Sequence, residues 1–350
     1  MNEKANSALE AKYEAQKIAF GPVIFQVSVA LRDFGILNYL FENKGGASVD
    51  EMHKALDVSN YGLNILLELG NEIGVVERKK NGNYTLSKTG YFLLRDEMTR
   101  VNMDFIQDVC YKGLFHLKES IQNGAPEGLK ELGDWPTIYA GLKDLDKKVQ
   151  DSWFAFDHFY SDDSFPEALK VIFQNRPKHL IDVGGNTGKW AIACCRHDPD
   201  VHVTIVDLPG QLEMATQHIK KAGFEDRISF EPINMLAPKK PIPKGDVIWM
   251  SQFLDCFSED EIVRILKHVS KSMEGNARLF IMETFWDNQK FPAASLSLAA
   301  TSVYFTTMAN GNSKMYGQEE FLNLIEKTGL FIENEFKEIG ISHTLLQVKK

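Results

Sequence analysis

The hydrophobic pattern changes after Pro177, and this change restricts the fold more than any other feature of the 350-residue sequence. Beyond it, short apolar runs alternate with amphipathic stretches; the runs are HLIDV, VTIVD, ISFEP, DVIWM and RLFIME, followed by FIENEF and TLLQV. Five runs separated by helical stretches predict a parallel sheet with crossover helices, the pattern of an α/β doubly wound domain. The last two runs lie close together, which predicts an antiparallel pair at one edge of that sheet.

The first part of the chain has a different, mostly helical pattern. Apolar residues recur at helical spacing over residues 18–40, which predicts two helices. Ser48 and Glu51 form a capping-box pattern, and Ser59 is the N-cap of a following helix. Two short strand patterns then flank a turn at Gly82. The order of helix, turn, helix and hairpin predicts a winged helix.

A winged helix commonly binds DNA through its second helix. In this chain residues 59–70 contain no Lys or Arg, and the formal net charge is −9, whereas phosphate binding depends on concentrated positive charge. We therefore expect a packing module and no nucleic-acid partner. The apolar stripes of residues 18–40 exceed what one small winged helix covers, which predicts a homodimer. We place the domain boundary near residue 110, giving domains 1–110 and 111–350.

The four cysteines are Cys110, Cys194, Cys195 and Cys256, with no CxxC pair and no histidine at a metal-ligand spacing. This pattern predicts no metal site and fits a reducing cytoplasm. The first 17 residues are polar and lack the apolar core of a signal peptide, and no apolar run reaches the length of a membrane span. We therefore expect a cytoplasmic protein without a membrane partner.

A glycine turn, GGNTG at residues 184–188, follows the run HLIDV and precedes a helical stretch. Such a turn lets the backbone approach a nucleotide-like ligand closely. Asp207 ends the next run, about 20 residues further on, where an acidic residue meets ribose hydroxyls in such folds. The turn lacks the full GxGxxG form and no GxxxxGK[ST] segment occurs, which disfavours dinucleotides and triphosphates.

The segments DVGGNTGKW, VDLP, INML with IPKGDVIWM, and FSEDEIVRIL resemble the plant caffeate-type and acetylserotonin-type family of S-adenosylmethionine-dependent O-methyltransferases. The first half resembles that family's dimerisation domain. The resemblance implies a Rossmann-like class I methyltransferase domain with an N-terminal, mostly helical winged-helix dimerisation domain. It also implies S-adenosylmethionine as cofactor, S-adenosylhomocysteine as product, and no metal.

The resemblance also implies which residues bind the cofactor. Asn234 stands where the family has a carboxylate that meets the adenine, and its amide can still bond an exocyclic amine. Ser251 stands where the family has a lysine. The cofactor-binding residues implied in this way are Asp182, Gly184, Gly185, Gly188, Asp207, Leu208, Asn234, Met235, Ser251 and Phe257.

The family's catalytic histidine falls on Asp255. Of the two glutamates that flank it in the family, Glu283 is kept and the other is replaced by Met315. A hydroxyl nucleophile needs a base with a pKa near the working pH, and an aspartate titrates near ~3.9 unless its site raises that value. Asp255 is thus a retuned base beside Glu283, or a residue that orients an amine, carbon or acidic hydroxyl acceptor, or a structural residue. His158 and His116 are candidate substitute bases, although a lone histidine in such an aromatic region is more often a core or rim residue.

The resemblance places the walls of the acceptor site at Phe156, Tyr160, Thr306 and Asn310. Together these observations predict a methyltransferase acting on a small aromatic or cyclic molecule, with O-methylation favoured over N- or C-methylation. One alternative is a family member that binds S-adenosylmethionine without transferring the methyl group, as a scaffold or for another reaction such as hydroxylation. A more distant alternative is a winged-helix DNA-binding regulator.

Overall fold

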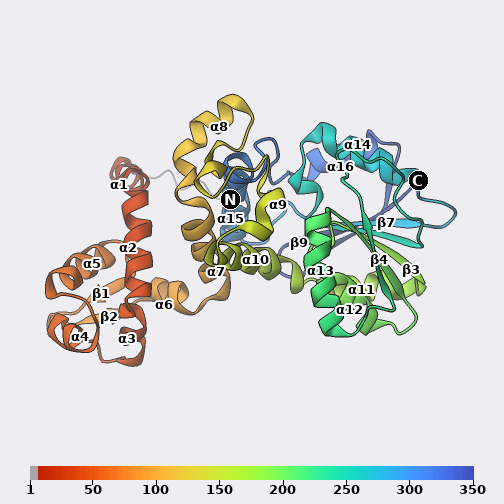
Figure 1. The fold of residues 1–350 in the computed structure, drawn as a ribbon. Coiled ribbons are helices and arrows are strands. Elements are labelled where there is room, and N and C mark those ends of the chain that lie inside the picture. Colours follow the sequence, from red (N-terminus) through yellow and green to blue (C-terminus); the bar gives the residue numbers. More distant parts are fainter. Residues whose placement is uncertain (1–6) are drawn as a thin grey trace. The chain divides into compact units, whose positions relative to one another are not determined.

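The computed structural model describes residues 7–350 and divides the chain into two compact units, Met1–Asp104 and Phe105–Lys350 (Figure 1). This division follows Asp104, whereas the sequence pattern placed it near residue 110. Each unit has a hydrophobic core of its own and is described by itself.

The first unit contains a winged helix preceded by two further helices. Its elements are α1 Ala8–Ala19, α2 Gly21–Asp33, α3 Ile36–Glu42, α4 Val49–Ala55, α5 Asn60–Glu72, β1 Val76–Arg78, β2 Tyr84–Leu86, α6 Lys88–Arg95 and α7 Glu97–Phe105. The predicted caps are confirmed: Glu51 N–H donates to Ser48 Oγ at 3.3 Å, and Gly62 N–H donates to Ser59 Oγ at 3.0 Å. The antiparallel β1–β2 hairpin is confirmed as well.

Helix α1 buries none of its side chains within the described part of this unit. Leu9 and Ile18 on this helix are 81% and 80% exposed. Among residues 7–350 no single helix is long and apolar enough to cross a membrane, although the bent pair α2 and α3 passes the same test when taken together.

The second unit begins with irregular helical segments and continues as an α/β domain. The helical segments are η1 Ile106–Cys110, η2 Gly113–His116, α8 Leu117–Asn123, η3 Glu127–Glu131, α9 Ile138–Gly141, η4 Leu142–Asp144, α10 Lys147–Asp162, α11 Phe165–Ile172 and η5 Phe173–Asn175. The α/β part comprises β3 His179–Val183, α12 Lys189–His197, β4 His202–Asp207, α13 Pro209–Ala222, β5 Ile228–Pro232, β6 Val247–Ser251, η6 Leu254–Cys256, α14 Glu259–Ser270, β7 Arg278–Thr284, α15 Pro292–Tyr304, η7 Phe305–Ala309, α16 Gln318–Glu326, β8 Phe331–Ile339 and β9 His343–Lys349.

The sheet has the strand order β5-β4-β3-β6-β7-β9-β8, with the first five strands parallel. Strand β9 lies antiparallel to both β7 and β8, so the predicted antiparallel pair at the edge is confirmed. Helices α11, α12 and α13 pack on one face, and α14 and α16 pack on the other (Figure 1). The result is the predicted doubly wound arrangement, in which loops at the carboxyl ends of the parallel strands form the binding edge.

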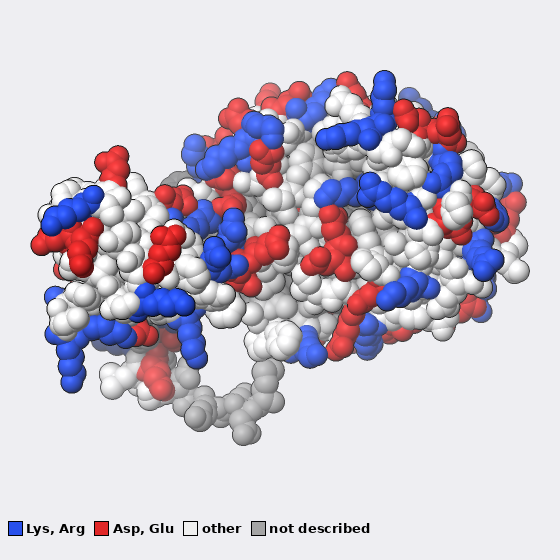
Figure 2. Space-filling view, turned by 90° about the horizontal axis from the view of Figure 1, so that it is seen from below, with Lys and Arg blue, Asp and Glu red and all other residues white. Residues whose placement is uncertain are grey.

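Acidic and basic side chains are interspersed over the larger unit on the face that Figure 2 presents. A mixed surface of this kind is ordinary for a globular protein and does not form the concentrated positive stripe that nucleic-acid binding uses.

Candidate active site

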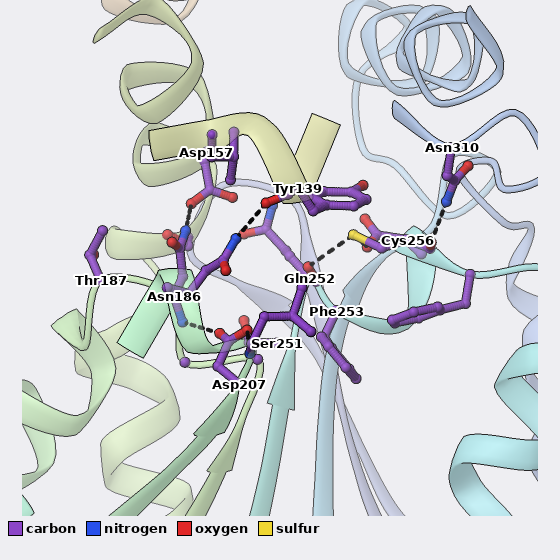
Figure 3. A pocket seen from close by; sticks show the side chains of 18 of the residues that line it. Tyr139, Asp157, Asn186, Thr187, Asp207, Ser251, Gln252, Phe253, Cys256 and Asn310 are labelled. Carbon is purple, nitrogen blue, oxygen red and sulfur yellow. Dashed lines mark hydrogen bonds between the residues drawn. The ribbon is translucent and has the colours of Figure 1, made fainter. Parts of the chain in front are cut away.

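A cavity of about 630 Å³ lies in the second unit, where the carboxyl ends of the parallel strands meet helices α10 and α15. Its volume falls within the roughly 300–1,000 Å³ of small-molecule sites. Figure 3 shows side chains from the strand ends and from the helical segments pointing into this space. The helices supply aromatic walls, and the strand ends supply the polar groups.

The glycine turn after β3 forms the floor of one part of the cavity. Gly184 has a φ of 79°, and a Cβ atom there would lie 2.3 Å from the ring of Phe253. At Gly185, a Cβ atom would lie 2.6 Å from Asp182 Oδ2. The backbone of the turn therefore packs closely against Phe253 and Asp182 only because these two residues lack side chains.

Gly188, which the sequence placed in the cofactor site, does not line the cavity among the described residues. It begins helix α12 with a φ of 79° and packs against Ile219, which would lie 3.1 Å from an added Cβ atom. Its role in the structure is thus to turn the chain into the helix rather than to face the cavity.

Asp207 at the end of β4 is held in place by two backbone donors. Asn186 N–H donates to its Oδ2 at 2.9 Å, and Leu208 N–H donates to its Oδ1 at 2.7 Å (Figure 3). Burial raises its pKa to about 6. Each carboxylate oxygen keeps a lone pair for a further donor, so the pair of oxygens suits two neighbouring hydroxyl groups.

Three buried polar atoms of the strands at this edge are left without partners among residues 7–350. They are Asp182 Oδ2, Ser251 Oγ and Thr284 Oγ1, and all three residues line the cavity. Burial, and then the charge of Asp207, raise the pKa of Asp182 to about 8. Unsatisfied buried groups are costly in a folded protein, so their presence beside a glycine turn fits a bound polar ligand.

The predicted adenine-binding residues also line the cavity, at the carboxyl end of β5 and in the loop after β6. Asn234 is exposed and accepts the Leu236 N–H at 2.9 Å, whereas Met235 is buried. The Phe257 ring meets the Phe253 ring edge to face at a centroid distance of 4.9 Å. A flat heterocycle bound here would contact the apolar side chains of Met235 and Phe257 and could form hydrogen bonds with the amide of Asn234.

Asp255 lies in the short helix η6 that follows β6, and it faces the cavity although only 6% of its surface is exposed. Its Oδ1 atom accepts the Cys256 thiol at 3.5 Å. Burial raises the pKa of Asp255 to about 6. An aspartate in this environment titrates closer to neutral pH than an exposed one.

Glu283 lies behind the turn that carries Asp255 and is absent from the lining of the cavity within the described chain. Its Oε1 atom accepts the N–H groups of Phe253 at 3.2 Å and Leu254 at 3.0 Å. Burial, and then the charge of Asp255, raise its pKa well above the ordinary value. The sequence grouped Glu283 with the catalytic residues; in the structure its carboxylate contacts the backbone of the turn that precedes Asp255.

The aromatic walls come from helix α10 and from the segment around α15. The Phe156 ring stacks on Phe105 at a centroid distance of 3.9 Å, and Tyr160 contacts Phe156 at 5.0 Å. Trp153 Nε1 donates to the Tyr304 hydroxyl at 2.8 Å. These side chains enclose an apolar space in which a ring-shaped molecule is shielded from water.

Of the two other predicted acceptor residues, Asn310 lines the cavity and donates through Nδ2 to the Cys256 carbonyl (Figure 3). Thr306 does not line it; its hydroxyl donates to the Ser302 carbonyl at 3.0 Å. Leu298, Thr301 and Phe305 share the helix face that meets the cavity, and position 306 lies about 100° further round. Thr306 lies within the π-helical turn Phe305–Ala309, and Asn310 follows that turn directly.

The two substitute bases differ in position. His158 lines the cavity, and burial is the main reason why its pKa is lowered to about 4. His116 lies outside the cavity lining within the described chain, with Nε2 3.0 Å from Glu131 Oε1.

Sequence reasoning missed several polar residues of the cavity. Asp157 accepts Asn186 Nδ2 at 3.0 Å, Gln211 Nε2 donates to the Tyr139 carbonyl at 2.8 Å, and Gln252 has a buried unpaired Oε1 among the described residues. No sequence signal identified Asp157, because a residue next to Phe156 lies about 100° further round the helix and only packing places it at Asn186. Gln211 and Tyr139 meet only through the tertiary fold.

Strand order and site together define a class I S-adenosylmethionine-dependent methyltransferase fold, with the binding edge at the carboxyl ends of β3 to β6. Residues 165–331 match the family profile of the O-methyltransferase domain, and residues 12–84 match that of the Dimerisation2-like domain. The chain therefore carries an O-methyltransferase domain and a Dimerisation2-like domain, the two parts that its motifs predicted.

Individual relatives are distant. The norreticuline-7-O-methyltransferase of Papaver somniferum is 23% identical over 264 residues, which cover 74% of this chain and 70% of that protein. Several other curated relatives are matched over less than half of their own length.

Two solved structures share the fold over nearly the whole chain. Human N-acetylserotonin methyltransferase in complex with S-adenosylmethionine has a TM-score of 0.69 at 17% identity, covering 100% of this chain and 99% of that one. The O-methyltransferase NcsB1 from neocarzinostatin biosynthesis, in complex with S-adenosylmethionine and 2-hydroxy-5-methyl naphthoic acid, has a TM-score of 0.71 at 18% identity, covering 99% of each chain.

Proposed function

We propose that this protein transfers the methyl group of S-adenosylmethionine to an oxygen atom of a small aromatic or cyclic acceptor. The observation that carries the proposal is a single cavity that joins the glycine turn and Asp207 to an aromatic-walled space with Asp255 at its edge. The match to the O-methyltransferase domain supports the same activity. One similar protein is named as a norreticuline-7-O-methyltransferase, and the structure of another contains 2-hydroxy-5-methyl naphthoic acid.

The cofactor would be held along the strand ends. Asp207 would accept the ribose hydroxyls, and Asn234 with Met235 and Phe257 would enclose the adenine. The orphaned acceptor of Asp182 and the close backbone approach at Gly184 support this fit. When bound, S-adenosylmethionine supplies an activated methyl group on a positively charged sulfur.

Asp255 would act as the base in this scheme. Its Oδ2 atom, which Cys256 does not engage, would accept the proton of the acceptor hydroxyl and so leave the oxygen as the nucleophile for the methyl group that the cofactor supplies. A pKa of about 6 leaves the carboxylate ionised at neutral pH while keeping it a stronger base than an exposed aspartate. Glu283 would be a positioning residue that fixes the turn through its two backbone contacts.

With an amine or carbon acceptor, Asp255 would orient the acceptor and would not deprotonate a hydroxyl.

The remaining candidate is a family member that binds the cofactor without methyl transfer. It is motivated by Asp255, which stands where the family has its catalytic histidine. The family match favours O-methylation over both.

The proposal includes a homodimer in a reducing cytoplasm. The match of residues 12–84 to a dimerisation domain and the exposed apolar residues of α1 support the dimer. A reducing cytoplasm is supported by the four free thiols, which are those of Cys110, Cys194, Cys195 and Cys256.

The test is an assay for S-adenosylhomocysteine with panels of phenols, amines and carbon acids as acceptors. Turnover with phenolic acceptors and methylation at oxygen, located by mass spectrometry, is the expected result. Cofactor binding without turnover on any acceptor would instead favour the non-methylating member.

A further inference from the structure

We propose that Asp157 binds the ammonium group of the cofactor's methionine moiety and so fixes the tail of the cofactor against helix α10. This inference rests on the proposed function, because it concerns the same ligand. It assigns a role to a carboxylate that the sequence motifs did not identify.

The order of the strands in the sheet indicates where each part of the cofactor would lie. Asn234 follows β5, Asp207 ends β4, and the glycine turn follows β3; these strands are neighbours in the sheet. Neighbouring strands lie about 4.8 Å apart, so an adenine at β5 and a ribose at β4 place the third part of the ligand at the end of β3. The methionine moiety therefore falls over the glycine turn.

Asp157 stands directly at this position. Asn186 of the turn donates its backbone N–H to Asp207 at 2.9 Å and its side-chain Nδ2 to Asp157 Oδ2 at 3.0 Å. Figure 3 shows the three residues in a row, with Asp157 reaching from α10 onto Asn186 and Asp207 beneath it. Asn186 thus links the carboxylate of Asp207, which we assign to the ribose, to the carboxylate of Asp157.

The carboxylate of Asp157 is open to the cavity. Its side chain keeps 27% of its surface exposed, it lines the cavity, and its Oδ1 has no hydrogen-bond donor within the described residues. Two other acids of this region also line the cavity. Asp162 is paired with Lys189 at 2.6 Å, and Asp182 is only 2% exposed. Asp157 is therefore the accessible carboxylate without a paired lysine or arginine among the described residues.

The charges around Asp157 favour a cation. Burial and the neighbouring carboxylates Asp162 and Asp255 raise its pKa to about 7, while the Asn186 contact and Lys189 oppose this shift. Lys189 is occupied by Asp162 at 2.6 Å, and His158, 3.7 Å from Asp157, has a lowered pKa and is neutral at pH 7. No cation in the described chain therefore neutralises Asp157 directly, and a ligand ammonium would do so.

The experiment compares two ligands that share adenine and ribose but differ in the tail. S-adenosylhomocysteine carries the amino-acid tail, and 5′-methylthioadenosine lacks it. Calorimetric titration of wild type, Asp157→Asn and Asp157→Ala should show a dissociation constant for S-adenosylhomocysteine raised about tenfold or more, as expected for loss of a charge-assisted hydrogen bond. Binding of 5′-methylthioadenosine should stay within about twofold of wild type, which also shows that each variant is folded.

Asp163→Asn is the matched control, since it removes the same charge next to the C-terminus of α10 from an exposed side chain outside the cavity lining of the described chain. It should leave both affinities unchanged. Equal loss of both ligands, or loss of neither, in the Asp157 variants would overturn the inference while leaving the proposed function in place. Failure of wild type to bind either ligand would overturn both.

Discussion

At the scale of single residues, the cavity is distinguished by carboxyl groups that burial keeps close to neutral pH. The pKa values of Asp182, Asp157, Asp207 and Asp255 are raised to between about 6 and about 8. The sequence could identify Asp207 and Asp255 because a motif or a resemblance marks their positions. It could not identify Asp157, because only the packing of α10 against the glycine turn brings that carboxylate to Asn186.

Substitution of Asp255 tests its role as the base. Asp255→Asn should lower turnover by about 10² or more, since removal of a general base typically costs ~10²–10⁴, with cofactor affinity nearly intact. In wild type, activity should rise as the pH increases through about 6, because the base must be ionised and is protonated below its pKa. A pH–rate profile of wild type and the variant measures both effects.

Full turnover of Asp255→Asn across that profile would rule out Asp255 as the base. The proton would then pass to His158 or solvent, since His116 lies outside the cavity lining of the described chain. A raised KM for the acceptor with unchanged kcat would instead assign Asp255 the orienting role for an amine or carbon acceptor.

At the scale of elements, regular segments were predictable and irregular ones were not. The apolar runs of β3 and β6 are buried on both faces, so their continuous apolar composition marked them as strands. The π-helical turn Phe305–Ala309 has no sequence signature; in the structure Asn310, which follows it, lines the cavity, and Thr306 within it does not line the cavity among the described residues. The structure of the helical segments before α10 likewise depends on aromatic packing that periodicity does not specify.

The glycine turn provides a test at this scale. Gly184→Ala should destabilise the protein by about 1–3 kcal/mol, because it strains a left-handed backbone and brings Cβ against the Phe253 ring. The same change should weaken S-adenosylhomocysteine binding by about tenfold or more, since the turn cannot keep its backbone position. Thermal melting and calorimetry are the measurements.

Gly45→Ala is the control for that substitution, because no atom lies within 4 Å of the added Cβ and Gly45 is in the first unit. It should leave both quantities close to wild type. Wild-type affinity in Gly184→Ala would show that the turn does not touch the ligand.

At the scale of the whole molecule, hydrophobic pattern and motifs predicted two domains, their fold classes and the antiparallel edge of the sheet. They placed the boundary near residue 110 rather than after Asp104, because α7 and η1 follow one another without a Gly- or Pro-rich linker. They also led to the dimer hypothesis, and helix α1 indicates where the interface would lie, because none of its side chains is buried within the described part of the first unit.

The dimer is tested by charging this helix. Leu9→Glu combined with Ile18→Glu should shift the protein towards the monomer mass in light scattering, since burying two carboxylates in an apolar interface is costly. Lys12→Glu is the control, because it adds an acidic group to the same helix without removing an apolar side chain. A monomer mass for wild type across dilution would reject the dimer.

The central claim is that the cavity binds S-adenosylmethionine through Asp207, and calorimetric titration of wild type and Asp207→Ala tests it most directly. We predict a dissociation constant in the micromolar range for wild type. For Asp207→Ala we predict a value about one to two orders of magnitude higher, because two charge-assisted hydrogen bonds to the ribose are lost. Absence of binding to wild type, or an unchanged affinity in Asp207→Ala, would contradict the account.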